Sequence, residues 1–244
     1  MSSTARILGI IETIVAHQES GLSFAEIVAQ TGMPKATVHR LLKELNEAGY
    51  LTFGPESKKY KGSLKLASLG AGVMSCFDLR DHVHPQMIKM HQETHHVCNM
   101  AVKHGDLGIY VDKVESQDFG IKLFSAVGKT FPLHSTALGK VLLAHCAPPE
   151  VKRILSLPLT SFTSQTITDP EKLREELQVI LQQGYAVDRE EVTRGLMCVA
   201  APIHGHNGDL IGAISVTFPT YIYEERGIET EIEVVKRYAA AISG

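Results

Sequence analysis

The sequence predicts an α+β protein in which a winged helix-turn-helix comes first and a larger mixed domain follows. Three observations predict this class. The first 50 residues show only helical apolar spacings, interrupted by glycine-containing breaks. A short strand pair rich in lysine follows at residues 50–61. From about residue 97, apolar strand segments are mixed with short helices. We expect an N-terminal domain over residues 1–62, a linker helix over 63–78 and a second domain over 79–244.

Residues 34–48 form the helix that most directly indicates a function. Its apolar residues Val38, Leu41, Leu42 and Leu45 are spaced by three, four and seven positions and make one buried stripe. Pro34 suits the first helical position, because its φ angle is already helical and its missing N–H is not needed there. The other side carries side chains able to donate to phosphates and base edges, which are Lys35, Thr37, His39, Arg40 and Lys43. Such a helix suits the major groove of DNA, although an ordinary amphipathic helix with a solvated basic face has the same pattern.

The flanking residues favour DNA binding. Ser23 and Glu26 fit a capping box for a shorter preceding helix, and Thr31-Gly32-Met33 makes a three-residue break before the second helix. This is the helix-turn-helix layout. After it, Tyr50–Phe53 and Lys58–Lys61 read as a hairpin around Gly54–Ser57. We expect this wing to place Lys58 and Lys59 near DNA phosphates.

Composition limits the function classes further. The 244 residues are 44% hydrophobic and 21% charged, with a net charge of −3, as in an ordinary globular protein. Residues 1–62 carry a net charge of only +1, so DNA affinity must come from the placement of the charges. The four cysteines are too widely spaced for a zinc ribbon or a disulfide framework, which indicates a reducing compartment. No secretory signal or long apolar span is present, so we expect a cytoplasmic protein without membrane contact.

The remaining elements follow in order. Residues 4–16 form a first helix that packs on the next two. In the linker helix, Leu66, Leu69, Val73 and Phe77 form a narrow seam, compatible with a dimer contact or with packing inside one chain. Asp78 is a candidate N-cap for a helix to about His95. The second domain should then hold strands at 97–103, 107–114, 197–203 and 210–218, and helices at 135–144, 150–155, 169–184 and 224–242.

Several segments of the second domain resemble the IclR-type bacterial transcriptional regulators. They are Phe131-Pro132-Leu133-His134-Ser135-Thr136-Ala137-Leu138-Gly139-Lys140, Gly184-Tyr185-Ala186-Val187-Asp188-Arg189-Glu190, Gly195-Leu196-Met197-Cys198-Val199-Ala200 and Gly212-Ala213-Ile214-Ser215-Val216-Thr217. The resemblance implies a sensing domain of GAF-like fold and a regulator that represses or activates genes by binding an operator in double-stranded DNA as a homodimer or homotetramer. The chain departs from the family at His204-Gly205-His206, where many members have Phe-Asp.

The resemblance also implies an effector site for a small organic acid or related metabolite. Residues 134–138 should lead into the first turn of a helix, where the free N–H groups of Ala137 and Leu138 attract a carboxylate. By motif, the polar partners are Asp188, Cys198, Ser215 and Thr217, with Leu196 as an apolar wall. Ser215 and Thr217 are two apart on one strand and face the same side. The alternative is that Ser135 or Thr136 only caps its helix and that Ser215 and Thr217 only bond backbone groups.

Other chemistries fit less well. Gly139-Lys140 resembles the end of a phosphate-binding P-loop, but His134 replaces the first glycine and Val141 replaces the metal-binding hydroxyl residue. His134 and Ser135 lack the surroundings of a hydrolase nucleophile. His84, His91 and His95 share a helical face, yet their spacing is not that of a structural zinc site. We therefore expect no cofactor, no metal and no enzymatic activity. The alternatives to a ligand-responsive regulator are a constitutive DNA-binding protein whose second domain only oligomerises, and an enzyme acting on a small carboxylate.

Overall fold

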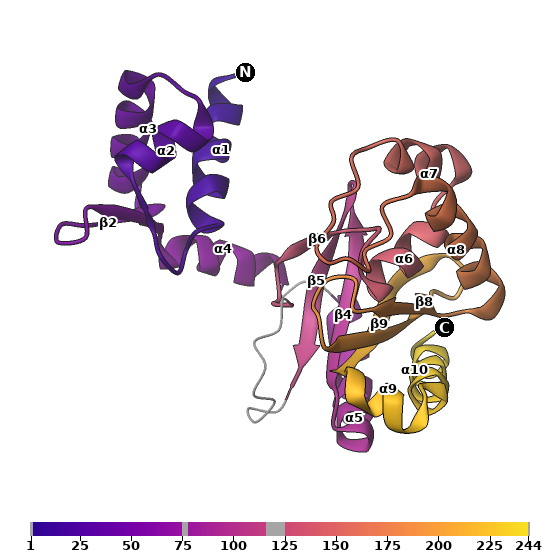
Figure 1. Ribbon diagram of the computed structural model, residues 1–244. Coiled ribbons are helices and arrows are strands. Elements are labelled where there is room, and N and C mark those ends of the chain that lie inside the picture. Colours follow the sequence, from indigo (N-terminus) through magenta and orange to yellow (C-terminus); the bar gives the residue numbers. More distant parts are fainter. Residues whose placement is uncertain (1, 75–77, 116–124, 244) are drawn as a thin grey trace. The chain divides into compact units, whose positions relative to one another are not determined.

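The computed structural model describes residues 2–74, 78–115 and 125–243. The chain divides into two compact units, Met1–Cys76 and Phe77–Gly244, so the linker helix belongs to the first. Figure 1 shows a helical unit that carries a small hairpin and a larger unit built on a curled sheet. In the described part of the chain, no helix is both long enough and apolar enough to cross a membrane.

The N-terminal unit is a three-helix core made of α1 (Ser3–Val15), α2 (Phe24–Thr31) and α3 (Lys35–Glu47). The predicted capping box is present, because Ser23 and Glu26 bond each other's backbone N–H groups. The apolar stripe of α3 is buried against Ile10, Ile14 and Ile27. Gly32 ends α2 at φ 64°, a left-handed conformation that glycine adopts without steric penalty. The prediction for Pro34 is wrong by one position: it precedes α3 in an extended conformation (ψ 137°), and Lys35 is the first helical residue.

The predicted wing is an antiparallel hairpin. It consists of β2 (Leu51–Gly54) and β3 (Lys59–Gly62), and the short β1 (Leu22–Ser23) adds to the outer side of β3. The linker helix α4 (Leu64–Met74) follows directly. In the predicted seam, Leu69 is 52% exposed and Val73 is 73% exposed within a single chain, whereas Phe77 lies outside the described residues. Leu69 and Val73 therefore have room for a partner.

The second unit is organised around a six-stranded antiparallel sheet in the order β6-β5-β4-β9-β8-β7. Its strands are β4 (Val97–His104), β5 (Leu107–Val114), β6 (Thr130–Pro132), β7 (Ala186–Arg189), β8 (Leu196–His204) and β9 (Leu210–Pro219). The four predicted strands are present. The two short edge strands β6 and β7 were not predicted, since runs of three and four residues carry no readable alternation.

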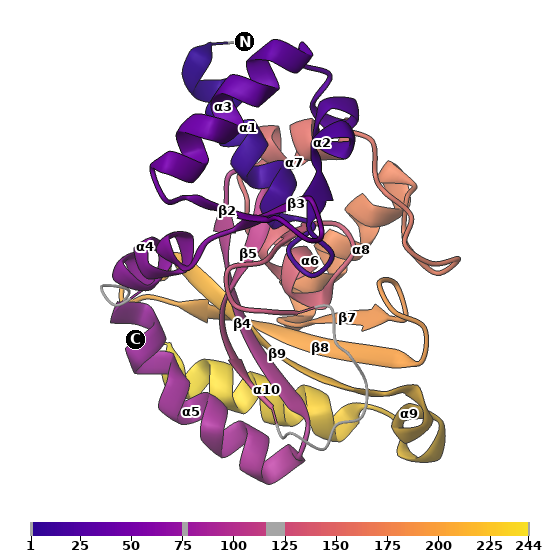
Figure 2. The ribbon, with the colours of Figure 1, turned by 90° about the vertical axis from the view of Figure 1, so that its left-hand side faces the viewer.

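Helices cover both faces of this sheet. One face packs against α5 (Asp78–Thr94) and α10 (Glu229–Ile242), as Figure 2 shows. The other packs against α6 (Ala137–Ala144), which is wholly buried and lies beside α8 (Pro170–Gln183), with α7 (Pro148–Leu155) completing the layer. Small strand residues face α6, namely Ala101, Ala200 and Ala213. They let this helix approach the sheet closely, and they leave space wherever α6 does not cover it.

Two helix predictions need comment. Residues 224–242 were predicted as one helix, but the structure has α9 (Thr220–Arg226) and α10, separated at Gly227 and Ile228. The cause is Gly227 at φ 77° and ψ −164°, a conformation outside the helical region that glycine tolerates. Asp78, predicted as an N-cap, is the first helical residue of α5, and the residues just before it lie outside the described ranges.

Candidate functional site

A cavity lies where the N-terminus of α6 faces the sheet. The centre of a water molecule can occupy a volume of about 50 Å³ inside it. This volume is several times what one ordered water needs. All seven residues predicted for an effector site line it: Ala137, Leu138, Asp188, Leu196, Cys198, Ser215 and Thr217. Six further lining residues were not predicted, namely Asn99, Tyr110, Ser125, Thr136, Val192 and Thr193. The motif positions, far apart in sequence, are thus brought together at one place.

The N-terminus of α6 points free donors at this cavity. Thr136 is the N-cap, and its hydroxyl accepts a hydrogen bond from the Gly139 N–H at 2.8 Å. That bond satisfies the third N–H of the helix. Thr136 therefore does cap α6, as the alternative interpretation of this residue expects. Ala137 and Leu138 line the cavity, and their N–H groups, in the first turn of the helix, have no hydrogen-bond partner in the described protein. With the positive end of the helix dipole behind them, they favour an anionic group.

The opposite wall is the sheet, where the register aligns the polar side chains. Cys198 on β8 lies between Asp188 on β7 and Thr217 on β9. One step along the sheet, Ser215 lies opposite Asn99 on β4. Directly opposed residues of antiparallel strands project to the same face, which explains why these side chains meet. The Cys198 thiol and the Thr217 hydroxyl are 3.1 Å apart and share one hydrogen bond.

Burial shifts the ionisation of the cavity groups. Asp188 is only 4% exposed, and burial, reinforced by the nearby Glu191 carboxylate, raises its pKa to about 7. One of its oxygens accepts a hydrogen bond from the Glu191 N–H at 2.7 Å. Burial also raises the pKa values of the Cys198 thiol and the Tyr110 hydroxyl, so both groups are protonated near neutral pH. The cavity therefore holds no activated sulfur nucleophile.

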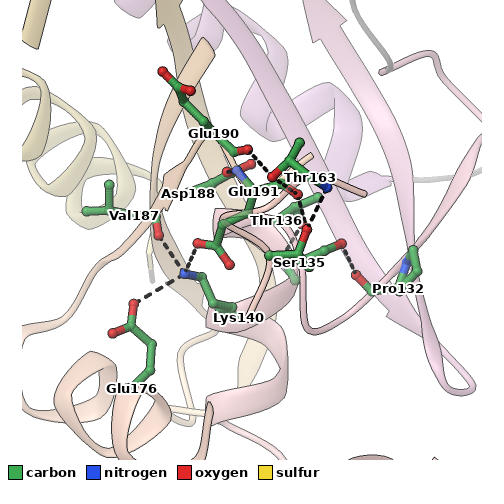
Figure 3. Close-up of polar contacts among 12 residues, drawn as sticks. Pro132, Ser135, Thr136, Lys140, Thr163, Glu176, Val187, Asp188, Glu190 and Glu191 are labelled. Carbon is green, nitrogen blue, oxygen red and sulfur yellow. Dashed lines mark hydrogen bonds and ion pairs between the residues drawn. The ribbon is translucent and has the colours of Figure 1, made fainter. Parts of the chain in front are cut away.

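A buried ion cluster fixes the loop after β7. The Lys140 ammonium donates to Glu191 Oε1 at 2.7 Å, to the Val187 carbonyl at 2.6 Å and to Glu176 Oε1 at 3.2 Å. Figure 3 shows this cluster directly beside Asp188. The hydroxyls of Thr163 and Thr166 donate to backbone carbonyls of the same loop. Since Val192 and Thr193 in this loop line the cavity, the cluster holds one of its walls in place.

Asn99 is an unpaired polar group in this wall. The residue is 3% exposed, and its Oδ1 atom is buried without a hydrogen-bond partner. Leaving a buried amide oxygen unpaired destabilises a folded protein by about 1–3 kcal/mol. The sequence offered no sign of this residue, because its position depends on strand register between residues more than 100 positions apart.

The second candidate site is the exposed side of α3. Lys35, His39, Arg40 and Lys43 are exposed there, and Thr37 is half-buried at its margin. Arg40 forms an ion pair of 2.6 Å with Glu44, and the His39 ring meets the edge of the Phe24 ring. Ala36, not predicted, lies on the same exposed face one turn before Arg40. The basic side chains predicted for DNA thus share one accessible surface.

The wing lysines differ from one another. Lys58 is exposed in the turn at φ 53°. The ammonium of Lys59 instead donates to the Ser20 carbonyl at 3.1 Å, so it already has a partner inside its own domain. Lys61 on the same strand does the same with the Glu19 carbonyl at 2.8 Å. Lys58 is therefore the wing lysine best placed to reach a phosphate.

The rival chemistries find little support in the geometry. Lys140 is fully buried and paired with carboxylates, which is incompatible with the phosphate contact of a P-loop lysine. His134 interacts with the Thr160 carbonyl at 2.9 Å rather than with Ser135. His84 bonds Asp112, and His91 bonds the His96 carbonyl. Over residues 2–74, 78–115 and 125–243, no three His, Cys, Asp or Glu side chains come together as a metal site would require.

Comparison with known proteins identifies the family of the chain. Residues 3–55 match the IclR helix-turn-helix domain, and residues 71–244 match the bacterial transcriptional regulator IclR C-terminal domain. The HTH-type transcriptional regulators KdgR of Dickeya chrysanthemi and of Escherichia coli are 34% and 33% identical to the chain over 244 residues. These 244 residues make up all of this chain in both cases, and 79% and 92% of the two relatives.

Solved structures extend the comparison to the fold. The IclR of Thermotoga maritima is 32% identical with a TM-score of 0.72, over 98% of this chain and 96% of that one. An IclR homologue from Microbacterium hydrocarbonoxydans, solved with 4-hydroxybenzoate, has a TM-score of 0.82 at 24% identity, over 99% and 98% of the two chains. The predicted family and fold class are confirmed, and the relatives are regulators rather than enzymes. The chain belongs to the IclR family of bacterial transcriptional regulators, and it is a DNA-binding transcriptional regulator.

Proposed function

We propose that this regulator responds to a small organic acid bound in the cavity at the N-terminus of α6. The observation that carries the proposal is the convergence of two unpaired backbone N–H groups, at Ala137 and Leu138, with a polar wall on the facing sheet. A carboxylate accepts from the helix N-terminus, where no lysine or arginine is needed. As a regulator of bacterial genes, the protein would act in the cytoplasm, where the chromosome is.

The facing wall argues for an effector with a hydroxyl or oxo group besides its carboxylate. Asp188 disfavours a second negative charge but can exchange hydrogen bonds with a hydroxyl, and Ser215 and Thr217 offer hydroxyls of their own. The 4-hydroxybenzoate complex of the Microbacterium relative supports an acid of this general kind. A plain fatty acid would leave these polar groups unpaired, at a loss in binding free energy.

For the DNA contacts, we propose that α3 enters the major groove with Lys35, Thr37, His39 and Arg40 near base edges. Lys43, Lys58 and Lys59 would face phosphates, with Lys59 exchanging its bond to Ser20 for a phosphate. One helix of this size reads only a few base pairs, so useful specificity needs two copies on adjacent half-sites. We propose that the exposed apolar residues of α4 contribute to a homodimer, which the sensing domains can pair into a tetramer.

Effector binding would act by shifting the assembly between DNA-competent and DNA-incompetent arrangements. It can do so only to the extent that the acid binds one arrangement more tightly than the other. A protein that binds DNA constitutively, with a second domain that only oligomerises, is the remaining alternative. The built cavity favours a responsive protein, because an oligomerisation domain has no use for buried polar groups that bond nothing.

The test combines a thermal-shift screen of small hydroxy and oxo acids with a gel shift on the DNA fragment upstream of the protein's own gene. We expect at least one acid to raise the melting temperature of the protein and to change the DNA shift. Asp188→Ala and Ser215→Ala should each weaken both effects, while Ser164→Ala, at an exposed serine outside the cavity, should leave both unchanged. DNA binding that no acid alters would support the constitutive alternative.

A further inference from the structure

The polar groups of the cavity divide into those with a protein partner and those without. The Cys198 thiol and the Thr217 hydroxyl bond each other, and one Asp188 oxygen accepts from Glu191. Unpaired donors lie at the helix end, at Ala137 and Leu138. Among the acceptors in the described residues, the Oδ1 atom of Asn99 is fully buried and has no partner. Donors for a carboxylate and an acceptor for something else therefore line one cavity, from different elements.

The acceptor belongs to a rigid part of the fold. Asn99 is the third residue of β4, a strand that lies between β5 and β9, and its cross-strand partners are Lys113 and Ser215. Central strands give a side chain little freedom to move away from the position that its register fixes. The side chain of Asn99 also has no hydrogen bond to another residue in the described parts of the chain. Its amide group can therefore bond a ligand without first losing a protein partner.

A hydroxyl group suits such an amide better than any other small polar group. It can donate to Oδ1 and accept from the Nδ2 group of the same side chain. An oxo or carboxylate oxygen can only accept, which would leave Oδ1 unpaired. A methylene group would leave both amide atoms unpaired. Binding sites built around a buried polar group discriminate strongly against ligands that leave this group unpaired.

We propose that Asn99 is a specificity-determining residue of the effector site, selecting acids that carry a hydroxyl group remote from the carboxylate held by α6. This inference rests on the proposed function of the cavity. Asn99 would act by direct contact: its amide oxygen accepts the hydroxyl proton of the effector while the carboxylate lies at the N–H groups of Ala137 and Leu138.

Matched pairs of acids test this directly. Glycerate and propionate, 3-hydroxybutyrate and butyrate, and gluconate and hexanoate each share a carbon skeleton and differ in hydroxyl groups. Their dissociation constants for the full-length protein are measured by calorimetry. In at least one pair the hydroxylated acid should bind about tenfold more tightly, since one hydrogen bond contributes on that scale. Asn99→Leu, which branches like asparagine but is larger and has no polar atoms, should bring the ratio within that pair close to one.

Two further variants separate specificity from damage to the site. Asn99→Ala avoids the extra bulk of leucine at a buried position and should also abolish the preference. Val192→Ala removes an apolar lining group and should weaken both members of a pair alike. If the preference survives in a folded Asn99→Leu or Asn99→Ala protein, or if wild-type protein binds both members of every pair equally, Asn99 has no such role although the cavity still binds acids. If no acid binds wild-type protein, the proposed function fails and this inference fails with it.

Discussion

The ammonium of Lys140, on α6, lies 2.7 Å from Glu191 Oε1, in the loop after β7, and both side chains are buried. The ion pair joins the helix whose N-terminus faces the cavity to the loop that forms another wall, as Figure 3 shows. The N–H of the same Glu191 bonds Asp188. Lys140 and Glu191 thus connect α6, the loop after β7 and the carboxyl group of Asp188 in the cavity.

Breaking this ion pair should be strongly destabilising. Lys140→Met removes the cation and leaves Glu191 buried without compensation, so we expect the free energy of unfolding to fall by about 3–5 kcal/mol. Urea denaturation followed by circular dichroism measures it. Lys152→Met, at an exposed lysine on the neighbouring α7, is the matched control and should change stability by less than about 0.5 kcal/mol.

A double variant tests whether the loss comes from the uncompensated charge. Lys140→Met combined with Glu191→Gln no longer has the buried charge at position 191, although the half-buried Glu176 also loses its cation, and it should recover part of the stability that the single variant loses. Equal stability of the single and double variants would show that the methylene stem of Lys140, and not its charge, accounts for the effect.

Asp188 should make stability depend on pH. Its ordinary pKa of 3.8 is raised to about 7 in the folded protein, chiefly by burial. Between these values the folded protein keeps a proton that the unfolded chain has lost, so the contribution of Asp188 is fully present below about pH 4 and falls as pH rises towards 7. Asp188→Asn stays neutral and still accepts from the Glu191 N–H. The stability of wild-type protein relative to this variant should therefore fall by a few kcal/mol between pH 5 and pH 8.

The measurement is urea unfolding of both proteins at several pH values without added acid. Asp81→Asn, at an exposed position on α5, serves as the control and should keep the pH dependence of wild-type protein. A constant difference between wild-type protein and Asp188→Asn across this range would mean that the Asp188 carboxyl is ionised throughout.

Local signals explain how much of the fold was readable from the sequence. The stripe at Val38, Leu41, Leu42 and Leu45 and the capping box at Ser23 depend on residues within one or two helical turns of each other, and both are present in the structure. The split between α9 and α10 was missed because apolar spacing continues across Gly227, while the backbone there leaves the helix. The short edge strands β6 and β7 were missed because runs of three and four residues are too short to show an alternating apolar pattern.

In the candidate site too, residues within local motifs could be predicted from the sequence, and residues brought in by the sheet could not. The seven residues expected from motif resemblance all line one cavity, since the motifs carry their positions with them. Asn99 and Tyr110 lie outside those motifs, on strands whose register with β9 and β6 is set by the whole sheet. The partner of Lys59 was equally hidden, because Ser20 is 39 residues away in sequence and only the folded wing brings the two together.

The exposed apolar side of α4 should hold two copies of the chain together. Leu69 and Val73 are largely exposed in one chain, and exposed apolar residues on one helical face favour association. We expect wild-type protein to have at least a dimeric mass by light scattering at micromolar concentration. Leu69→Glu with Val73→Glu should weaken association of the N-terminal units, and Ser68→Glu, beside the seam, should not. A dimeric mass and undiminished DNA binding in the double variant would place the interface elsewhere.

Arg40 and Lys58 should affect DNA binding in different ways. Arg40 is exposed on α3, where its guanidinium can leave Glu44 and make a bidentate pair with a guanine, which contributes about 1–3 kcal/mol of discrimination. Lys58 at the wing tip can reach only the backbone. Arg40→Ala should therefore lower the ratio of affinities for the upstream fragment and for random DNA by about tenfold or more. Lys58→Ala should lower both affinities equally and reduce the salt dependence of binding by about one counterion.

Fluorescence anisotropy at several salt concentrations measures both quantities. Lys172→Ala, at an exposed lysine on α8, is the control and should change neither the affinities nor their salt dependence. An unchanged affinity ratio in Arg40→Ala would mean that α3 does not read bases through this residue, and the orientation of α3 in the groove would have to be revised.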